Sequence, residues 1–422
     1  MSRSDRGAND STAAFHKLVA TGSLQDVRAA VLAGADLNAP GHCGRTALMV
    51  AIEAKDPEKV ELLVAHGADP ELTDDFNRTP LQCAVEYDFT DGVRYLLGCG
   101  VDRGYVPRYP LKPIDHELPA SEIPLPDSLR GIMSEAEWQE SIEQANKSTR
   151  EHRLNPTVEP VIRNVQSIEV LNLLVAAGDD LNLAPREAKR LLVGLGNDAE
   201  LSVAKRDYRR DKSPRCGTKN PEPMDLPFWH DMIRTGGNAY TARTKFDDQD
   251  MSAPIWCFNR FGSSLTPLAD GRFVQIAGEH EDHYDPDFHI YNDVVVHDGR
   301  GGCRIFGYPS EVFPPTDGHS ATLIGDGIYI IGCIGYPDQR RPGFTPVYRL
   351  TLETWRIDEV ATTGDMPGWI FNHGAVYDAT RNVIRVAGGE VETRAADGTS
   401  ELVPHQHRFE LDLTSLRWRR LA

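Results

Sequence analysis

The stretch TALMVAIEAKDPEKVELLVAHGAD, residues 46–69, decides the fold of the N-terminal third. Its apolar residues return at helical spacing, first within residues 48–52 and again within residues 60–64. This pattern predicts two short helices, and Gly67 supplies a left-handed residue that ends the second one. Neither helix can bury its apolar face alone, so we expect the unit to stack against copies of itself.

Copies of this unit do lie on both sides of it. The phrase Gly-Ala-Asp at 67–69 occurs also at 34–36 and, as Gly-Val-Asp, at 100–102. These units resemble the ankyrin repeat in the Thr-Pro-Leu at 79–81, the Leu-Leu pair before Gly-Ala-Asp and the turn glycine Gly44. Asn77 replaces that glycine in the next unit, and asparagine tolerates a positive φ. The resemblance covers residues 11–102 and implies a helical solenoid that binds proteins.

The segment that follows interrupts the array. Residues 103–156 hold a proline-rich stretch, predicted to be an extended loop, and then a polar helix that begins near Ser134. This insertion is either a surface loop without a role or a flap over the ankyrin array or the second domain. Residues 157–200 repeat the Leu-Leu-Val phrase at 173–175 and the glycine at 178, which predicts a fourth, diverged repeat.

Residues 254–422 predict an all-β domain. Asp-Gly turns at 270–271 and 326–327 separate short β patterns, which is typical of hairpins. The strand ends Gly278, Gly332 and Gly388 recur at intervals of 54 and 56 residues, which suits blades of four strands.

These units resemble the kelch repeat, with a histidine before the first strand at His319 and His373 and an aromatic residue downstream such as Trp355. The expected fold class is therefore multidomain: an ankyrin α-solenoid followed by kelch-like β-propeller blades. Three blades are recognisable, whereas closed propellers use four to eight. Either residues 201–253 supply a hidden blade, or the sheets stay open against the ankyrin part, or two chains combine. Open edges would allow a homodimer.

Composition and charge narrow the function. The chain has 422 residues with 45 Lys and Arg against 63 Asp and Glu, a net charge of −18, which argues against nucleic acid and anionic membranes as partners. Its seven cysteines include no Cys-x-x-Cys pair, as expected of reduced thiols in a cytoplasmic protein. We expect residues 1–10 to be disordered. Residues 201–253, basic at first and then proline-rich, are expected to form a linker that docks the two halves, with the cations paired to acidic groups.

Catalytic signatures such as Gly-x-Ser-x-Gly and the Walker loop are absent from the sequence. One stretch, residues 279–289, is dense in potential metal ligands, and Glu281, Asp285 and His289 lie four residues apart. Two carboxylates and a histidine suit Fe(II), Mn(II) or Zn(II). The stretch resembles the iron-binding segment of plant nitrile-specifier proteins, and under that resemblance either Glu279 or Glu281 is the first ligand. No cofactor is otherwise required.

Equivalent loops in the other two blades also carry candidate ligand-binding residues. Arg340 and Arg341 could clamp an anion, and His405 and His407 occupy the corresponding exit in the last blade. If the three loops converge, one mouth of the β domain would carry all of these side chains. A solvated loop without a ligand is the alternative in each case.

Both modules resemble families that mostly bind proteins. The sequence therefore favours a non-catalytic scaffold or adaptor whose protein partner is not identified. The surface expected to bind it consists of ankyrin turn residues, namely His42, Arg45, Asp74, Asp75, Phe76 and Arg78. The alternative is a metal-dependent enzyme or small-molecule binder with its site at the mouth of the β domain, the ankyrin repeats serving for targeting.

Overall fold

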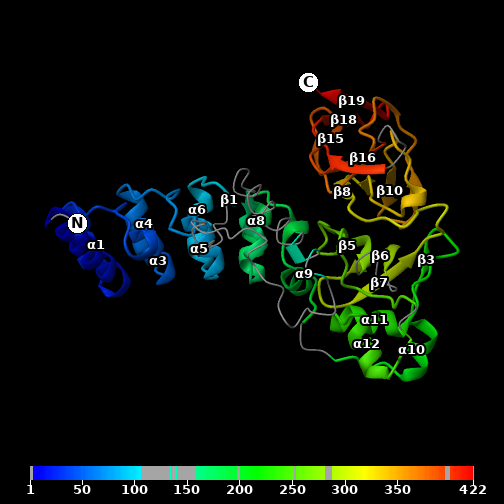
Figure 1. The fold of residues 1–422 in the computed structure, drawn as a ribbon, viewed down its shortest axis with the longest axis horizontal. Coiled ribbons are helices and arrows are strands. Elements are labelled where there is room, and N and C mark those ends of the chain that lie inside the picture. Colours follow the sequence, from blue (N-terminus) through cyan, green and yellow to red (C-terminus); the bar gives the residue numbers. More distant parts are fainter. Residues whose placement is uncertain are drawn as a thin grey trace. The chain divides into compact units, whose positions relative to one another are not determined.

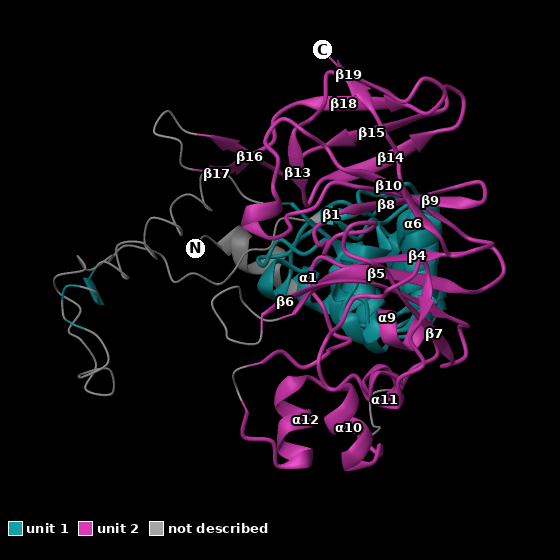
Figure 2. Ribbon diagram, turned by 90° about the vertical axis from the view of Figure 1, so that its right-hand side faces the viewer, with its two compact units in different colours: residues 1–188 teal, residues 189–422 magenta. Residues whose placement is uncertain are grey.

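The computed structural model describes residues 3–105, 134, 136, 138–139, 158–196, 200–250, 253–280, 288–394 and 400–421, without the side chains of residues 3–10. The chain divides into two compact units, residues 1–188 and 189–422 (Figures 1 and 2). The first unit is helical and the second is mostly β.

The helices of the first unit form two stacked layers. In one layer α1 packs on α3, α3 on α5, and α5 on η4; in the other α2 packs on α4, α4 on α6, and α6 on α8. The elements are α1 (Arg3–Thr21), α2 (Leu24–Leu32), η1 (His42–Gly44), α3 (Ala47–Glu53), α4 (Pro57–Ala65), α5 (Pro80–Glu86), α6 (Thr90–Gly98), β1 (Gly104–Tyr105), β2 (Glu159–Pro160), η4 (Val161–Asn164), α8 (Ile168–Ala176), η5 (Leu181–Leu183) and α9 (Arg186–Leu192), the last crossing into the second unit.

The predicted helix boundaries agree with the structure in the ankyrin units. Thr46 and Thr79 cap α3 and α5, because each hydroxyl accepts a hydrogen bond from the backbone N–H three residues later. Gly67 follows α4 with φ of 100°, and Asn77 adopts a φ of 60° at the turn position that Gly44 holds one repeat earlier. Helix α1 differs from the prediction: it buries Phe15 and Val19 and continues back to Arg3, through the segment expected to be disordered.

In the described residues, the β region contains four sheets arranged like the blades of a propeller. Three of them have mainly antiparallel orders, β3-β7-β6-β5-β4, β11-β10-β9-β8 and β12-β19-β18-β15-β14, and the fourth is β13-β16-β17. The strands are β3 (Glu222–Pro223), β4 (Ser264–Pro267), β5 (Phe273–His280), β6 (His289–His297), β7 (Cys303–Gly307), β8 (Ser320–Ile324), β9 (Gly327–Ile331), β10 (Val347–Thr351), β11 (Ile357–Glu359), β12 (Thr363–Gly364), β13 (Trp369–Phe371), β14 (Gly374–Asp378), β15 (Val383–Ala387), β16 (Glu390–Arg394), β17 (Ser400–Pro404), β18 (Arg408–Asp412) and β19 (Arg417–Leu421), with η6 at Pro337–Gln339.

The count of three blades therefore misses one sheet, and residues 201–253 are not its source. Strands β16 and β17 leave the third sheet after β15 and return to it at β18, so β15 pairs directly with β18. The hairpin that they form pairs with β13 and makes the small fourth sheet. Sequence spacing hid it because the excursion lies inside the third repeat.

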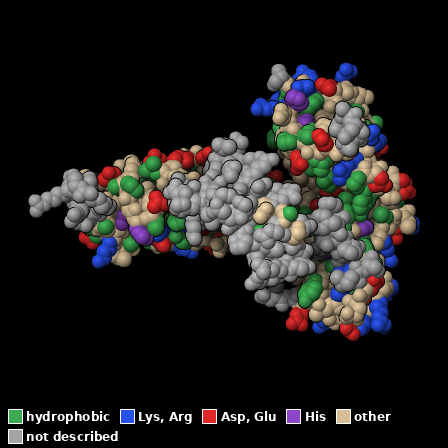
Figure 3. Space-filling model, in the orientation of Figure 1, with side chains coloured by type: hydrophobic (Ala, Val, Ile, Leu, Met, Phe, Trp, Pro, Cys, Tyr) green, Lys and Arg blue, Asp and Glu red, His purple; other side chains and the backbone are tan. Residues whose placement is uncertain are grey.

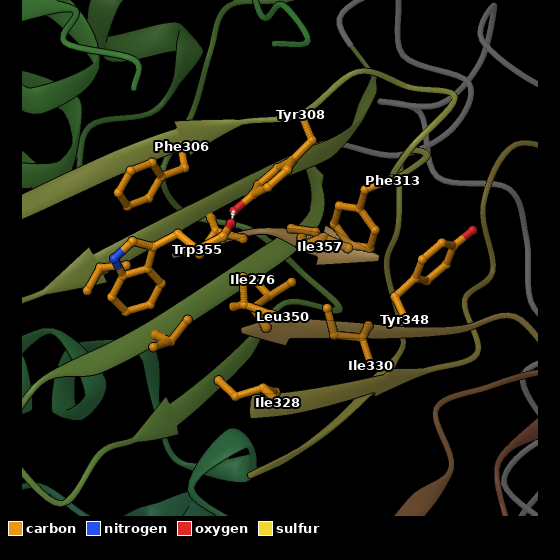
Figure 4. Close-up of a cluster of buried hydrophobic side chains, with 14 of the residues drawn as sticks. Ile276, Phe306, Tyr308, Phe313, Ile328, Ile330, Tyr348, Leu350, Trp355 and Ile357 are labelled. Carbon is orange, nitrogen blue, oxygen red and sulfur yellow. Dashed lines mark hydrogen bonds between the residues drawn. The ribbon is translucent and has the colours of Figure 1, made fainter. Parts of the chain in front are cut away.

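Neighbouring sheets share buried cores. One cluster joins the first and second sheets and includes Ile276, Phe306 and Leu350 (Figure 4). Within it the Tyr308 hydroxyl donates a hydrogen bond to the Trp355 carbonyl at 2.8 Å, so even its polar atom is satisfied. A second cluster joins the second sheet to the third. This continuity makes the three larger sheets one packed body.

Within residues 201–253, which were expected to form a linker, the structure has three helices. They are α10 (Lys205–Asp211), α11 (Pro227–Thr235) and α12 (Ala239–Phe246). Trp229 of α11 stacks on Trp256 at 4.7 Å between ring centroids, within the second unit. The cations pair as expected, with Arg210 on Asp207 at 3.0 Å and Lys212 on Asp248 at 2.6 Å.

Candidate functional site

The ankyrin turns are built by a repeated backbone bond. The N–H of Gly41 donates to the carbonyl of Arg45 at 2.8 Å, and one repeat later the N–H of Asp74 donates to that of Arg78 at 3.1 Å. Adjacent turns also touch, because the Asp75 N–H donates to the Cys43 carbonyl at 3.0 Å. A side chain at Gly44, whose φ is 72°, would place its Cβ within 2.7 Å of the Asp75 nitrogen, so this contact requires glycine.

Asp74 serves the turn and does not face a partner. Only 4% of it is exposed, and its carboxylate accepts hydrogen bonds from the N–H groups of Phe76 and Arg78, each at 2.9 Å. Its other oxygen pairs with the Arg78 guanidinium at 2.8 Å. Asp74 therefore has the capping chemistry of an Asx turn, and its carboxylate is bonded within the turn itself.

The two arginines of the predicted surface also serve the array. Arg78 pairs with Glu86 at 3.1 Å as well as with Asp74, and Arg45 pairs with Glu53 in the repeat before. These pairs span eight residues in each repeat and fix a half-buried guanidinium below each turn.

His42, Asp75 and Phe76 remain exposed at the tips of the turns. Phe76 is 40% exposed, and the Arg78 guanidinium lies 5.4 Å from the centre of its ring. A guanidinium at this distance holds an aromatic ring by a cation–π contact. The result is an exposed aromatic side chain braced by a neighbouring guanidinium, and the exposed Asp75 precedes it in the chain.

The metal-ligand candidates lie at one end of the first sheet. His289 of β6 stands directly opposite His280 of β5, and Glu279 stands opposite Ile290. Glu281 and Asp285 fall outside the described residues. Burial and the charge of Arg260 lower the pKa of His289 to about 4, while Asp293 acts in the opposite direction. Among the described side chains, no group of three His, Cys, Asp or Glu residues is placed to hold a metal ion.

The loop of the second sheet meets this end of the first. The Ile290 N–H donates to the Tyr336 hydroxyl at 3.0 Å, and Phe288 packs edge-on against the Tyr336 ring. Arg340 is turned inward, since its Nε donates to the Ile334 carbonyl at 2.9 Å. Arg341 lies over Phe344, 3.8 Å from the ring centre. Both arginines therefore contact groups within their own loop. These contacts do not place either guanidinium as a clamp for an anion.

His405 and His407 lie between β17 and β18. The His405 ring stacks on Phe409 at 5.5 Å between centroids, and the His405 N–H donates to the Gly389 carbonyl at 2.8 Å. His407 lies 3.0 Å from the Arg420 guanidinium. The contacts described for these two histidines are with residues in or next to the third and fourth sheets. The loops of the first and second sheets therefore contact each other, whereas His405 and His407 pack within their own part of the β region.

A contact between a histidine and a serine recurs between successive sheets. The sequence analysis identified the histidines of this contact but not the serines. His319 Nε2 lies 2.9 Å from the Ser264 hydroxyl, and His373 Nε2 lies 2.9 Å from the Ser320 hydroxyl. Burial lowers the pKa of both histidines, to about 4 for His319 and about 3 for His373. The third sheet has Gly374 at the position of these serines, so the series ends there. The signal in the sequence was a serine at the start of the first strand in two of the three repeats, Ser264 and Ser320.

A buried ion pair anchors the helices to the first sheet. Arg260 and Asp293 have side chains only 1% and 4% exposed, and a second guanidinium nitrogen reaches the carboxylate at 2.9 Å. The Trp256 indole donates to the same carboxylate at 2.8 Å, and the guanidinium lies 3.5 Å from the Tyr291 ring centre. Every polar group is satisfied, which indicates a structural role.

Comparison with known proteins supports the N-terminal assignment. A family model of three ankyrin repeats matches residues 15–104. No family match supports a kelch identity for the β region. The chain is 36% identical over 70 residues to an L-asparaginase of Dirofilaria immitis, 38% over 72 residues to the human mitochondrial disaggregase and 37% over 70 residues to the putative ankyrin repeat protein YahD of Escherichia coli.

These matches cover 17%, 17% and 15% of this chain, and 12%, 10% and 35% of the respective relatives. The chain therefore spans well under half of each relative. Ankyrin repeats indicate a role in protein–protein interaction. No described helix has the length and apolar character that crossing a membrane requires.

Proposed function

We propose that this protein is an adaptor that binds a protein partner through the turn tips of its ankyrin array. The observation that carries the proposal is the exposed Phe76 ring braced by Arg78, in an array whose turn residues His42 and Asp75 are also exposed. Aromatic residues on rigid supports dominate the energetics of protein interfaces, because they bury a large area at little entropic cost. The residues committed to the turn, Asp74 among them, keep this surface in place.

The β region supplies the second surface that an adaptor needs. We infer that its sheets are kelch-like blades, since the first strands repeat one histidine–serine contact between neighbours. Acidic and basic side chains are interspersed over the described part of this region in Figure 3. A surface of mixed charge favours a protein partner over a polyanion, in line with the net charge of −18.

The test compares proteins captured from the native host by the full chain and by two variants. The double variant Asp75→Ala, Phe76→Ala removes the tip, whereas Leu32→Ala removes another exposed apolar side chain of the same array. We expect the tip variant to lose a specific partner by about tenfold or more, the loss that truncating an interface anchor produces. Identical partner sets and amounts for the wild type and both variants would contradict the proposal.

We also propose, as a second candidate function, that residues 279–289 bind a divalent metal. The register that puts His289 directly opposite His280 supports it, because directly opposed residues of antiparallel strands project from the same face. Because the pKa of His289 is lowered to about 4, its imidazole is neutral near pH 7 and can coordinate a metal without losing a proton. A bound metal would favour the enzyme or small-molecule alternative.

Calorimetric titration of Fe(II), Mn(II) and Zn(II) into the full chain tests this second candidate. We expect heat from one of the three metals that disappears in the double variant Asp285→Ala, His289→Ala. Equal heat from the wild type and the double variant, or none from either, counts against a metal at this loop.

A further inference from the structure

The third sheet has one face packed on the second sheet and one face exposed. Its strands β15, β18 and β19 lie at the end of the β region where the chain terminates (Figure 1). Ile384, Leu411 and Trp418 stand opposite one another across these strands and belong to the core shared with the second sheet. Neighbouring residues along each strand point the other way. Val376, on that outer side, is 69% exposed, so the described part of the protein leaves this face uncovered.

Arginines gather on the outer face around a single carboxylate. One row across the sheet consists of Val376, Arg385, Glu410 and Arg419, which stand directly opposite one another in β14, β15, β18 and β19. Arg419 pairs with Glu410, and Arg385 lies 3.8 Å from it. Arg381, in the turn between β14 and β15, donates to both oxygens of Glu410 at 2.8 and 3.0 Å. Three guanidiniums therefore share one acceptor group.

The cations of this cluster are exposed, whereas its anion is buried. The Glu410 side chain is 5% exposed, and those of Arg381, Arg385 and Arg419 are 44%, 45% and 63% exposed. Burial acts to raise the pKa of Glu410, but hydrogen bonds from Arg381 and Arg419 lower it overall, so the carboxylate is charged near pH 7. A guanidinium has more N–H donors than one shared carboxylate can accept. Glu410 thus orders the guanidiniums from below and leaves donors on their outer side.

The sheet is a basic region of an acidic protein. Residues 374–387 and 408–421, which are its four longer strands and their turns, hold six arginines, three acidic residues and no lysine, a net charge of +3. The whole chain has a net charge of −18. The exclusive use of arginine matters, because its planar guanidinium binds a carboxylate through two parallel hydrogen bonds and a lysine does not.

A purely structural role does not explain this excess of positive charge. One arginine would neutralise Glu410, and each further guanidinium adds a like charge close by, which opposes folding. The second sheet shows the ordinary arrangement, because the exposed Arg356 is paired with Asp358 at 3.0 Å. An anionic partner that neutralises the surplus accounts for the extra arginines of the third sheet.

We propose that the outer face of the third sheet binds an acidic segment of a protein partner. Carboxylates of the segment accept paired hydrogen bonds from Arg385 and Arg419, and Val376 offers an apolar contact beside them. A long polyanion fits less well, because the net charge of −18 repels it beyond the edge of the sheet. The inference rests on the proposed adaptor function: it places the second surface on this sheet and names the chemistry that the surface recognises.

Methyl NMR of the full chain tests the proposal, with the exposed Val376 as the reporter. The probe is the blocked hexapeptide Glu-Asp-Glu-Leu-Asp-Glu, and its control is the uncharged peptide Gln-Asn-Gln-Leu-Asn-Gln of the same shape. We expect saturable shifts of the Val376 methyl signals with the acidic peptide and none with the control. The binding should weaken as the ionic strength rises, because salt screens exposed charges.

Two double variants with the same change in charge separate this face from the charge of the whole protein. Arg385→Gln, Arg419→Gln removes two guanidiniums of the face, whereas Arg304→Gln, Arg356→Gln removes two exposed arginines next to the first and second sheets. We expect the first variant to weaken the binding of the acidic peptide about fivefold or more and the second to leave it within about twofold.

A single variant guards against a loss that comes from unfolding. Arg417 stands opposite Asp412 on the same face, outside the Glu410 cluster, and is exposed. Arg417→Gln should therefore leave the sheet intact and still weaken the peptide about twofold. Thermal unfolding of each variant shows whether its β region remains folded.

Several results would overturn the proposal. They are equal shifts with the uncharged peptide, no shifts in the wild type, and equal binding losses in the two double variants. Tighter binding of hexauridylate, which carries the same charge as the acidic peptide, would assign the face to nucleic acid instead. None of these measurements involves Phe76, so failure here is distinguishable from failure of the ankyrin surface in the adaptor proposal.

Discussion

The ankyrin array and the β region both repeat, but they join their repeats in different ways. In the array, Asn38 bridges to the next unit by donating to the Gly67 carbonyl at 3.2 Å and accepting from the Asp69 N–H at 2.8 Å, both in exposed positions. In the β region, the Ser264–His319 contact is buried and joins residues 55 apart. Removing one exposed hydrogen bond between neighbouring repeats should cost little stability. Removing one side chain of a buried long-range hydrogen bond leaves its partner unsatisfied and should cost more.

The largest expected effect comes from breaking the buried ion pair between Arg260 and Asp293 of β6. Arg260→Ala would leave the Asp293 carboxylate buried without its guanidinium, and breaking such a pair costs about 3–5 kcal/mol. Denaturant unfolding followed by tryptophan fluorescence reports this region, since residues 11–102 contain no tryptophan. Arg356→Ala, which breaks the exposed pair with Asp358, serves as the control and should cost about 1 kcal/mol or less. Equal losses in the two variants would contradict a structural role for the buried pair.

A smaller effect is expected in the array, at the turn. Asp74→Ala removes the acceptor of two backbone N–H groups and should destabilise the ankyrin helices by about 2 kcal/mol. Glu61→Ala, which removes an exposed carboxylate of α4, serves as the control and should change stability by less than about 0.5 kcal/mol. Thermal unfolding followed by circular dichroism checks both, and similar shifts in the two variants would show that the turn does not depend on Asp74.

The buried histidines should make the β region sensitive to acid. The pKa of His319 is lowered to about 4 from an ordinary value of 6.5, so the unfolded state binds the proton first. This contribution to stability is therefore complete above pH 6.5 and is lost as the pH falls toward 4. His319→Gln should make the dependence shallower by about 1.4 kcal/mol per pH unit near pH 5.

Ser264→Ala provides the matched control, because it removes the hydrogen bond and leaves the buried imidazole. It should lower stability by about 1 kcal/mol and keep the steep dependence on pH. Denaturant unfolding between pH 4.5 and 7 measures both. The opposite shift at Asp317, whose pKa is raised to about 6 by burial, is common to all the variants and does not affect their comparison.

The smallest effect tests the turn residue at positive φ. Asn77→Ala should destabilise the array by about 1 kcal/mol, because a β-carbon is disfavoured in the left-handed region. Asn77→Gly should be neutral or slightly stabilising, since Gly44 holds the equivalent place. Thermal unfolding of the two variants decides, and a more stable alanine variant would contradict the backbone argument.

The sequence predicted the array well because ankyrin contacts are local. Helix caps such as Thr79, the glycine stops and the exception at Asn77 all act within a few residues, so spacing alone locates them. The orientation of individual turn side chains could not be predicted in the same way. The sequence places both Asp74 and Phe76 in the same turn and does not show which side chain is buried. Only the hydrogen bonds to the Asp74 carboxylate show that it faces inward.

The long-range contacts of the β region could not be predicted from the sequence. The fourth sheet depends on β13 pairing with β16 within the third repeat, which no period reveals. The Arg260–Asp293 pair and the stacking of Trp229 on Trp256 join segments whose patterns give no sign of one another.

Site-specific photocrosslinking tests the central claim most directly. A photoreactive phenylalanine analogue replaces Phe76 in one protein and the exposed Leu32 in another, and both are irradiated in the native host. The account predicts a discrete crosslinked partner at position 76 that is absent at position 32. The same crosslinked species from both positions, or none from position 76, would contradict recognition through the turn tips.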